Sequence, residues 1–74
     1  MTVQEAVKEI VARSGGVKNA AVWLGVSRHT IHAWIAGRRH PTGAPVIRMA
    51  LELGVPVSLF LPELKDARGR FVEV

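Results

Sequence analysis

The sequence predicts a small all-α domain of four or five short helices. Its 74 residues suffice for one domain, and apolar residues recur at intervals of three and four in successive segments, as in helices with one buried face. Glycine readily adopts the left-handed conformation in which helices end, and glycines follow these segments at Gly15, Gly16, Gly25, Gly37 and Gly54. We therefore divide the chain into a helical domain, residues 1–64, and a C-terminal tail, residues 65–74.

The first helix is predicted from about Val3 to Arg13. Thr2 followed by Glu5 is a capping box, in which the hydroxyl and the carboxylate each accept a hydrogen bond from a backbone amide. The glycines that end this helix allow two interpretations. Either they bring the free amides of the next helix close to an anion such as a phosphate, beside Lys18 and Asn19, or they form a flexible loop.

Two short helices joined by a tight turn are predicted next. The first spans Val17–Leu24 and ends at Gly25, and Ser27 is a good N-cap for a second helix that starts at about Arg28 and ends at Gly37. The second helix has an apolar stripe formed by Ile31, Trp34 and Ile35. The residues expected to point away from the core are Arg28, His29, His32 and Ala33.

These residues resemble the lambda-repressor-like and Cro-type regulators of phages and bacterial operons. The matching positions are Ala20-Ala21, Leu24-Gly25-Val26-Ser27, Ile31, Trp34 and Gly37-Arg38-Arg39. The resemblance implies a helix-turn-helix in which Arg28 opens a recognition helix that enters the major groove of DNA. It further implies that the base-reading residues are Arg28, His29, His32 and Ala33.

A turn rich in cations follows the recognition helix, and Pro41 prevents the helix from continuing. We expect this turn to lie over the sugar-phosphate backbone. With the start of each helix of the pair included, the residues assigned to DNA phosphates are Lys18, Asn19, Ser27, Thr30, Arg38, Arg39 and His40.

The distribution of charge supports a DNA-facing surface. The net charge is +4, and no Asp or Glu occurs from Ile10 to Leu51. A field of one sign centred on a helix pair is expected of a phosphate-facing surface. The alternative is a solvated basic face without a partner.

A fourth helix is predicted after Pro41, capped by Thr42 or Gly43 and ended by Gly54. Its inward face is expected to consist of Ile47, Ala50 and Leu51. Arg48, in the middle of the helix, either contacts phosphate or is solvated, and we favour solvation.

The segment from residue 55 to 64 fits a short helix capped by Ser58 and ended at Pro62, or an extended strand. We favour the helix, because many members of the resembled family carry a fifth helix here. The tail is expected to form either a short strand from Phe71 or a frayed terminus.

Trp34 lies on the apolar stripe and is expected in the core, whereas Trp23 falls beside the buried face and needs a cover. That cover is either the C-terminal segment that carries Phe60 or a second subunit. The residues assigned to a dimer interface are Trp23, Phe60 and Phe71.

Several other classes of function are not expected. There is no cysteine, and His29 and His32 have no carboxylate or thiolate close to them in sequence, so no metal or other cofactor is predicted. Ser27 and His29 lie too close together for a nucleophile and its base, and we expect neither an enzyme nor a small-molecule substrate. No apolar run approaches the roughly 20 residues of a membrane span, so a cytoplasmic, nucleoid-associated location is expected.

The sequence therefore predicts a sequence-specific transcriptional regulator that binds double-stranded DNA. We expect a Cro-like repressor of phage or prophage type that binds a near-palindromic operator as a homodimer. The alternative is an antitoxin-like or adaptor protein whose main partner is another protein, with autoregulatory DNA binding.

Overall fold

The computed structural model describes residues 1–61, and this part of the chain is all-helical. Its elements are α1 (Val3–Ser14), α2 (Val17–Leu24), α3 (Arg28–Ile35), α4 (Ala44–Leu53) and the short 3-10 helix η1 (Val57–Phe60). The predicted fold class, a small all-α domain with a helix-turn-helix, is thereby confirmed. The expected end of the domain at residue 64 and the strand or frayed end of the tail lie outside the described residues.

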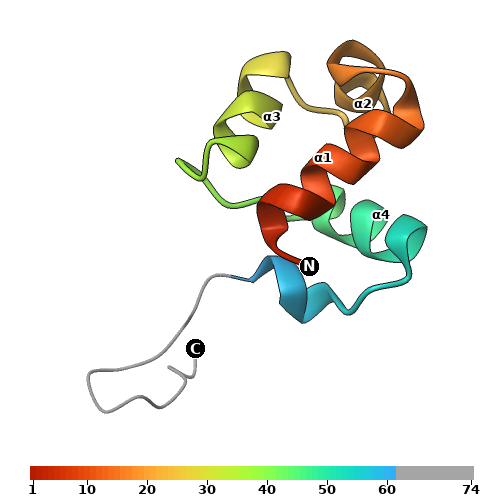
Figure 1. Ribbon diagram of the computed structural model, residues 1–74, viewed down its shortest axis with the longest axis vertical. Coiled ribbons are helices and arrows are strands. Elements are labelled where there is room, and N and C mark those ends of the chain that lie inside the picture. Colours follow the sequence, from red (N-terminus) through yellow and green to blue (C-terminus); the bar gives the residue numbers. More distant parts are fainter. Residues whose placement is uncertain (62–74) are drawn as a thin grey trace.

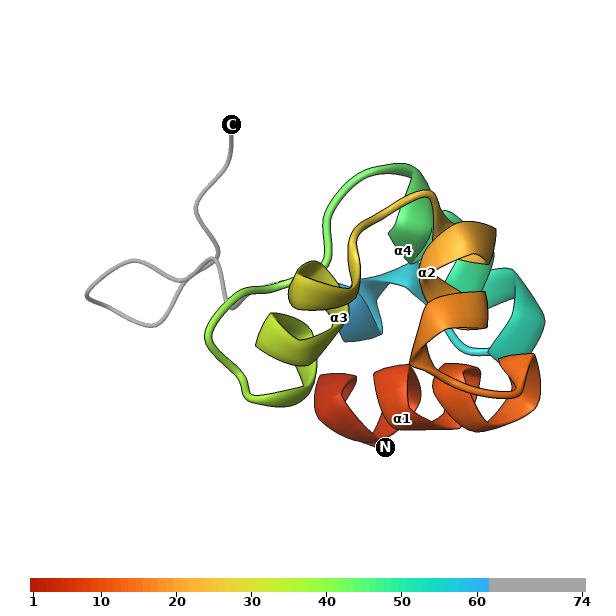
Figure 2. The same cartoon turned by 90° about the horizontal axis from the view of Figure 1, so that it is seen from above.

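Helix α1 lies at the centre of the fold, and α2, α3 and α4 all pack against it (Figure 1). Seen from above, α2 and α3 lie next to each other beside α1, with α4 beyond α2 (Figure 2). The core between these helices consists of apolar side chains that are at most 5% exposed, namely Ala6, Val7, Ile10, Ala20, Ala21, Leu24, Ile31, Trp34, Val46, Met49, Ala50 and Phe60.

The predicted capping box starts α1. The Thr2 amide donates to Glu5 Oε1 at 2.8 Å, and the Glu5 amide donates to Thr2 Oγ1 at 3.1 Å. The bond from the Thr2 amide is the main reason that the pKa of the Glu5 carboxyl lies below its ordinary value. The helix ends one residue later than predicted, at Ser14, with Gly15 in the left-handed conformation.

The turn between α2 and α3 has the predicted geometry. Gly25 has a φ of 72°, and the Val26 amide donates to the Ala21 carbonyl at 3.0 Å, which closes the end of α2. Ser27 then caps α3, since its Oγ accepts from the Thr30 amide at 3.2 Å. The end of α2 and the start of α3 thus follow from the positions of one glycine and one serine.

The predicted inward face of α4 is wrong. Ile47 and Leu51 are 55% and 79% exposed, whereas Val46, Met49 and Ala50 are buried. Helix α4 carries apolar residues around most of its circumference, so three-and-four spacing fits more than one rotation. Its charged residues, Arg48 and Glu52, lie one turn apart, and the side opposite to them contains Val46 and Ala50.

The segment after α4 is helical, as favoured, but it forms a 3-10 helix of four residues that begins earlier than predicted. Pro56 is its N-cap, so the assignment of Ser58 as the cap is wrong. Leu61 is extended, with φ −80° and ψ 138°, because a residue before proline is disfavoured in the α region. Phe60 is fully buried and attaches this segment to the core.

No helix within residues 1–61 combines the length and the apolar character that a membrane crossing requires.

Candidate nucleic-acid interface

The exposed side of α3 carries three of the four residues assigned to base reading. Arg28, His29 and His32 are all exposed, whereas Ile31 and Trp34 are 0% and 4% exposed. At about 100° per residue, the three polar side chains fall within an arc of roughly 100° around the helix axis. The helix therefore presents a narrow polar strip that can face a partner while its apolar stripe stays in the core.

Ala33, the fourth assigned base reader, does not belong to this strip. Its residue exposure is 7%, which places it among the buried apolar residues. The Arg38 amide donates to the Ala33 carbonyl at 2.9 Å, a main-chain bond that closes the end of α3. A buried methyl group cannot contact a base edge, so the assignment of Ala33 to base contact is wrong.

The turn after α3 exposes its cations. Arg38, Arg39 and His40 are all exposed, and Pro41, which follows them, is fully buried and fixes the end of the turn. Gly37 has a φ of 77°, and a Cβ atom there would lie 2.9 Å from Gln4 Nε2 on α1. The turn therefore packs closely against the first turn of α1, a contact that sequence reasoning missed because it joins distant residues.

The start of α2 is shaped by hydrogen bonds from the preceding loop. The Gly16 amide donates to the Val11 carbonyl at 3.0 Å, and Asn19 Nδ2 donates to the Ser14 carbonyl at 3.0 Å. These bonds hold the loop in one conformation, which disfavours the interpretation of a flexible loop, and whether its amides approach an anion stays a prediction. They also use the Asn19 amide group inside the chain, whereas Lys18, the other residue assigned to phosphate at this helix start, is exposed.

The backbone at the start of α2 remains open to an acceptor. Gly16 is the N-cap and has no side chain that could accept a hydrogen bond. The first backbone hydrogen bond of α2 runs from the Ala20 amide to the Gly16 carbonyl, at 3.0 Å. Amides at a helix start that have no partner within residues 1–61, together with the positive end of the helix dipole, favour an anion.

Ser27 and Thr30, both assigned to phosphate, have their hydroxyl oxygens 3.0 Å apart. Ser27 also accepts from the Thr30 amide, so its first role is to cap α3. Ser27 is exposed and Thr30 is half-buried, and a phosphate at this position would meet a hydroxyl pair that is already oriented by the cap.

Two arginines of the segment without acids, residues 10–51, donate hydrogen bonds to other residues of the protein. Arg13 Nε donates to Glu9 Oε1 at 3.1 Å, and its Nη1 donates to the carbonyl of Glu52 at 3.0 Å. Arg48 Nη1 donates to the Trp23 carbonyl at 2.8 Å. Arg48 is therefore neither simply solvated nor directed at phosphate, because it joins α4 to the last turn of α2.

The other cations in residues 1–61 have no side-chain hydrogen bond or ion pair within that part of the chain. Apart from Lys8 on α1, they all come from the helix-turn-helix and the turn that follows it, and they are Lys18, Arg28, Arg38 and Arg39. We call these four residues, with His29 and His32, the α3 surface.

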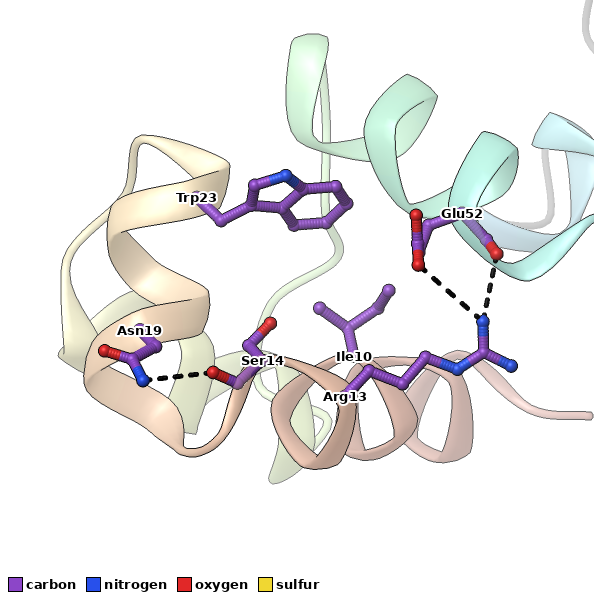
Figure 3. Close-up of a pocket in the computed structure, with 6 residues that line it drawn as sticks. All are labelled: Ile10, Arg13, Ser14, Asn19, Trp23 and Glu52. Atoms are coloured by element: carbon purple, nitrogen blue, oxygen red, sulfur yellow. Dashed lines mark hydrogen bonds and ion pairs between the residues drawn. The ribbon is translucent and has the colours of Figure 1, made fainter.

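The residues assigned to a dimer interface have different outcomes. Phe60 is fully buried within its own chain, so its assignment to an interface is wrong. Trp23 is 36% exposed and lies in a pocket with Ile10 of α1 and Glu52 of α4 (Figure 3). Residues of α1 and α4 thus border the space beside its ring, and its assignment to an interface stays a prediction. Phe71 lies outside the described residues.

Within residues 1–61, no group of three His, Asp or Glu side chains is placed to hold a metal ion. Comparison of the chain with protein-family models, with curated proteins and with solved structures gave no match in any of the three.

Proposed function

We propose that this protein is a sequence-specific regulator of transcription that binds double-stranded DNA through the α3 surface. The observation that carries the proposal is the contrast among its cations. Arg13 of α1 and Arg48 of α4 donate hydrogen bonds to other residues of the protein. The side chains of the exposed cations of the α3 surface make no such bond within residues 1–61 and can therefore bind a partner, namely Lys18, Arg28, Arg38 and Arg39.

The roles in the proposed complex follow from position. Arg28 stands at the start of α3, where an arginine can pair bidentately with O6 and N7 of guanine in the major groove. His29 and His32 carry nitrogen atoms that can donate to or accept from base edges or phosphates. Lys18, Arg38 and Arg39 flank the helix and neutralise phosphates, which fixes the register of the protein on the duplex.

We further propose that two copies act together on a near-palindromic operator as a repressor, in the cytoplasm where such DNA lies. One recognition helix reads only a few base pairs, and pairing places two of them about 34 Å apart. Since Phe60 is used in the core, the proposed pairing surface lies around the Arg48–Trp23 contact. Apolar side chains beside that contact are 55–79% exposed, namely Val22, Ile47 and Leu51.

The same three apolar residues support a second candidate function. An antitoxin-like or adaptor protein would use them to bind a different protein, with DNA binding in an autoregulatory role. Sedimentation of the purified protein with and without a bound duplex separates the two, because the first proposal requires two protein copies on each two-half-site duplex.

The proposed function is tested by selecting bound fragments from a random duplex library and measuring affinity for the enriched sequence. We expect a motif with two inverted half-sites and a preference over random DNA of at least about 10³-fold. Enrichment of no motif, together with an affinity that does not change with salt, would contradict the proposal.

A further inference from the structure

We propose that the pocket between α1, α2 and α4 binds a small organic cation, which is held between the indole ring of Trp23 and the carboxylate of Glu52. The pocket has a volume of ≈ 290 Å³, and its lining residues are Ile10, Arg13, Ser14, Asn19, Trp23 and Glu52. This site lies apart from the α3 surface, and Asn19 is the one lining residue that we also assigned to phosphate.

The pocket combines an aromatic face, an apolar floor and a carboxylate. Figure 3 shows the indole of Trp23 and the carboxylate of Glu52 on two sides of the space, with the side chain of Ile10 below it. Both Trp23 and Glu52 are exposed enough to be reached from solvent. An ammonium or amidinium group beside a tryptophan face is attracted by the ring quadrupole, and a carboxylate next to it adds an opposite charge.

The charges around the pocket favour a cation over an anion. Arg13 is shared by two carboxylates, since Glu9 Oε1 lies 3.1 Å from its Nε and Glu52 Oε1 lies 4.0 Å from its Nη1. Arg13 is thus paired more closely with Glu9, outside the pocket lining, than with the Glu52 carboxylate, which keeps acceptor capacity for a cation in the pocket. Two of the guanidinium nitrogens already donate to protein oxygens. Arg13 therefore links α1 to α4 and is not available to bind an anion in the pocket.

The size of the pocket limits the ligand. Ligand pockets usually measure about 300 to 1,000 Å³, so this one accommodates a body of about one ring or a short alkyl chain with one charged group. A ligand of that size with one cation–π contact is expected to have a dissociation constant on the order of a millimolar. The ligand class is thus a primary amine, amidine or guanidine with a compact apolar part.

The inference does not rest on DNA binding and is tested on the free protein. Benzylamine, which is a cation at neutral pH, is compared with benzyl alcohol and with benzoate as probes of similar shape. The readout is the chemical shift of the Trp23 indole N–H in titrations followed by nuclear magnetic resonance. The indole of Trp34, which is 4% exposed, serves as an internal reference that should not move.

We expect benzylamine to shift the Trp23 signal with saturation, benzyl alcohol to bind at least about threefold more weakly, and benzoate to give no saturable shift. Glu52→Gln should weaken benzylamine binding about three- to tenfold and leave benzyl alcohol unaffected. The bond from Arg13 to Glu52 uses the main-chain carbonyl, so this variant should stay folded.

Glu9→Gln is the matched control, because it also removes a carboxylate that pairs with Arg13 but Glu9 does not line the pocket. It should change benzylamine affinity by less than about twofold. Equal affinity for all three probes, tightest binding of benzoate, or unchanged benzylamine binding by Glu52→Gln would each overturn the proposal.

Discussion

Arg13 and Arg48, in α1 and α4, each donate to a main-chain carbonyl of a different helix, whereas Arg28, Arg38 and Arg39 make no side-chain bond within residues 1–61. In the sequence all five are similar, since they belong to a stretch without Asp or Glu. All five are exposed, and the structure separates them into arginines whose side chains bond to another helix and arginines whose side chains make no bond within residues 1–61. Net charge over a segment therefore overstates the charge that is available to a partner.

Mutations in the helix core and mutations on the α3 surface should have different effects. The largest effect on the free energy of unfolding is expected in the core. Phe60→Ala removes a ring that is fully buried beside α4 and should cost about 3–5 kcal/mol of the free energy of unfolding. Leu61→Ala, at a neighbouring position that is 53% exposed, should change it by less than about 0.5 kcal/mol. Urea denaturation followed by circular dichroism measures both, and similar losses in the two variants would place Phe60 at the surface.

On the α3 surface, Arg28→Ala should leave the free energy of unfolding unchanged and weaken binding to the selected operator by about 1–3 kcal/mol. The loss is expected at one base position in each half-site, because a bidentate arginine–guanine contact reads a single base pair. Lys8→Ala is the matched control, since Lys8 is an exposed cation on α1 outside the α3 surface. An equal loss in both variants would mean that Arg28 provides charge and not base recognition.

Arg48→Ala should have the opposite pattern. Loss of the 2.8 Å bond to the Trp23 carbonyl should lower the free energy of unfolding by about 0.5–1.5 kcal/mol. Affinity for a duplex with a single half-site, which does not depend on pairing of two copies, should fall only as far as the folded fraction falls. If thermal unfolding is unchanged while this affinity drops, Arg48 belongs with the arginines of the α3 surface and the comparison between the two regions is wrong.

The sequence predicted the helix-turn-helix well because its limits depend on local chemistry. Gly25 and Ser27 fix the end of α2 and the start of α3 through the backbone conformation of one residue and a cap by the other. The exposure of Arg28, His29 and His32 followed from helix periodicity alone. These features need no knowledge of what packs against the helices.

The wrong predictions, apart from the N-cap of η1, concern which side of a helix is buried and which helices are neighbours. Ala33 is buried although its place opposite the apolar stripe of α3 predicts that it is exposed. The spacing of apolar residues could not predict which side of α4 faces the core, since several sides of this helix are apolar. The roles of Arg48 and Phe60 depend on which helices are neighbours, and a one-dimensional pattern does not contain that information.

The most direct test of the central claim is the salt dependence of DNA affinity for single arginine variants. Each phosphate contact that is lost should reduce the slope of log affinity against log salt by about one. We expect this reduction for Arg38→Ala and for Arg39→Ala, and no reduction for Arg13→Ala or Arg48→Ala in the folded protein. Unchanged slopes for the first pair, or a reduced slope for the second pair, would contradict the division of the arginines into DNA-facing and structural groups.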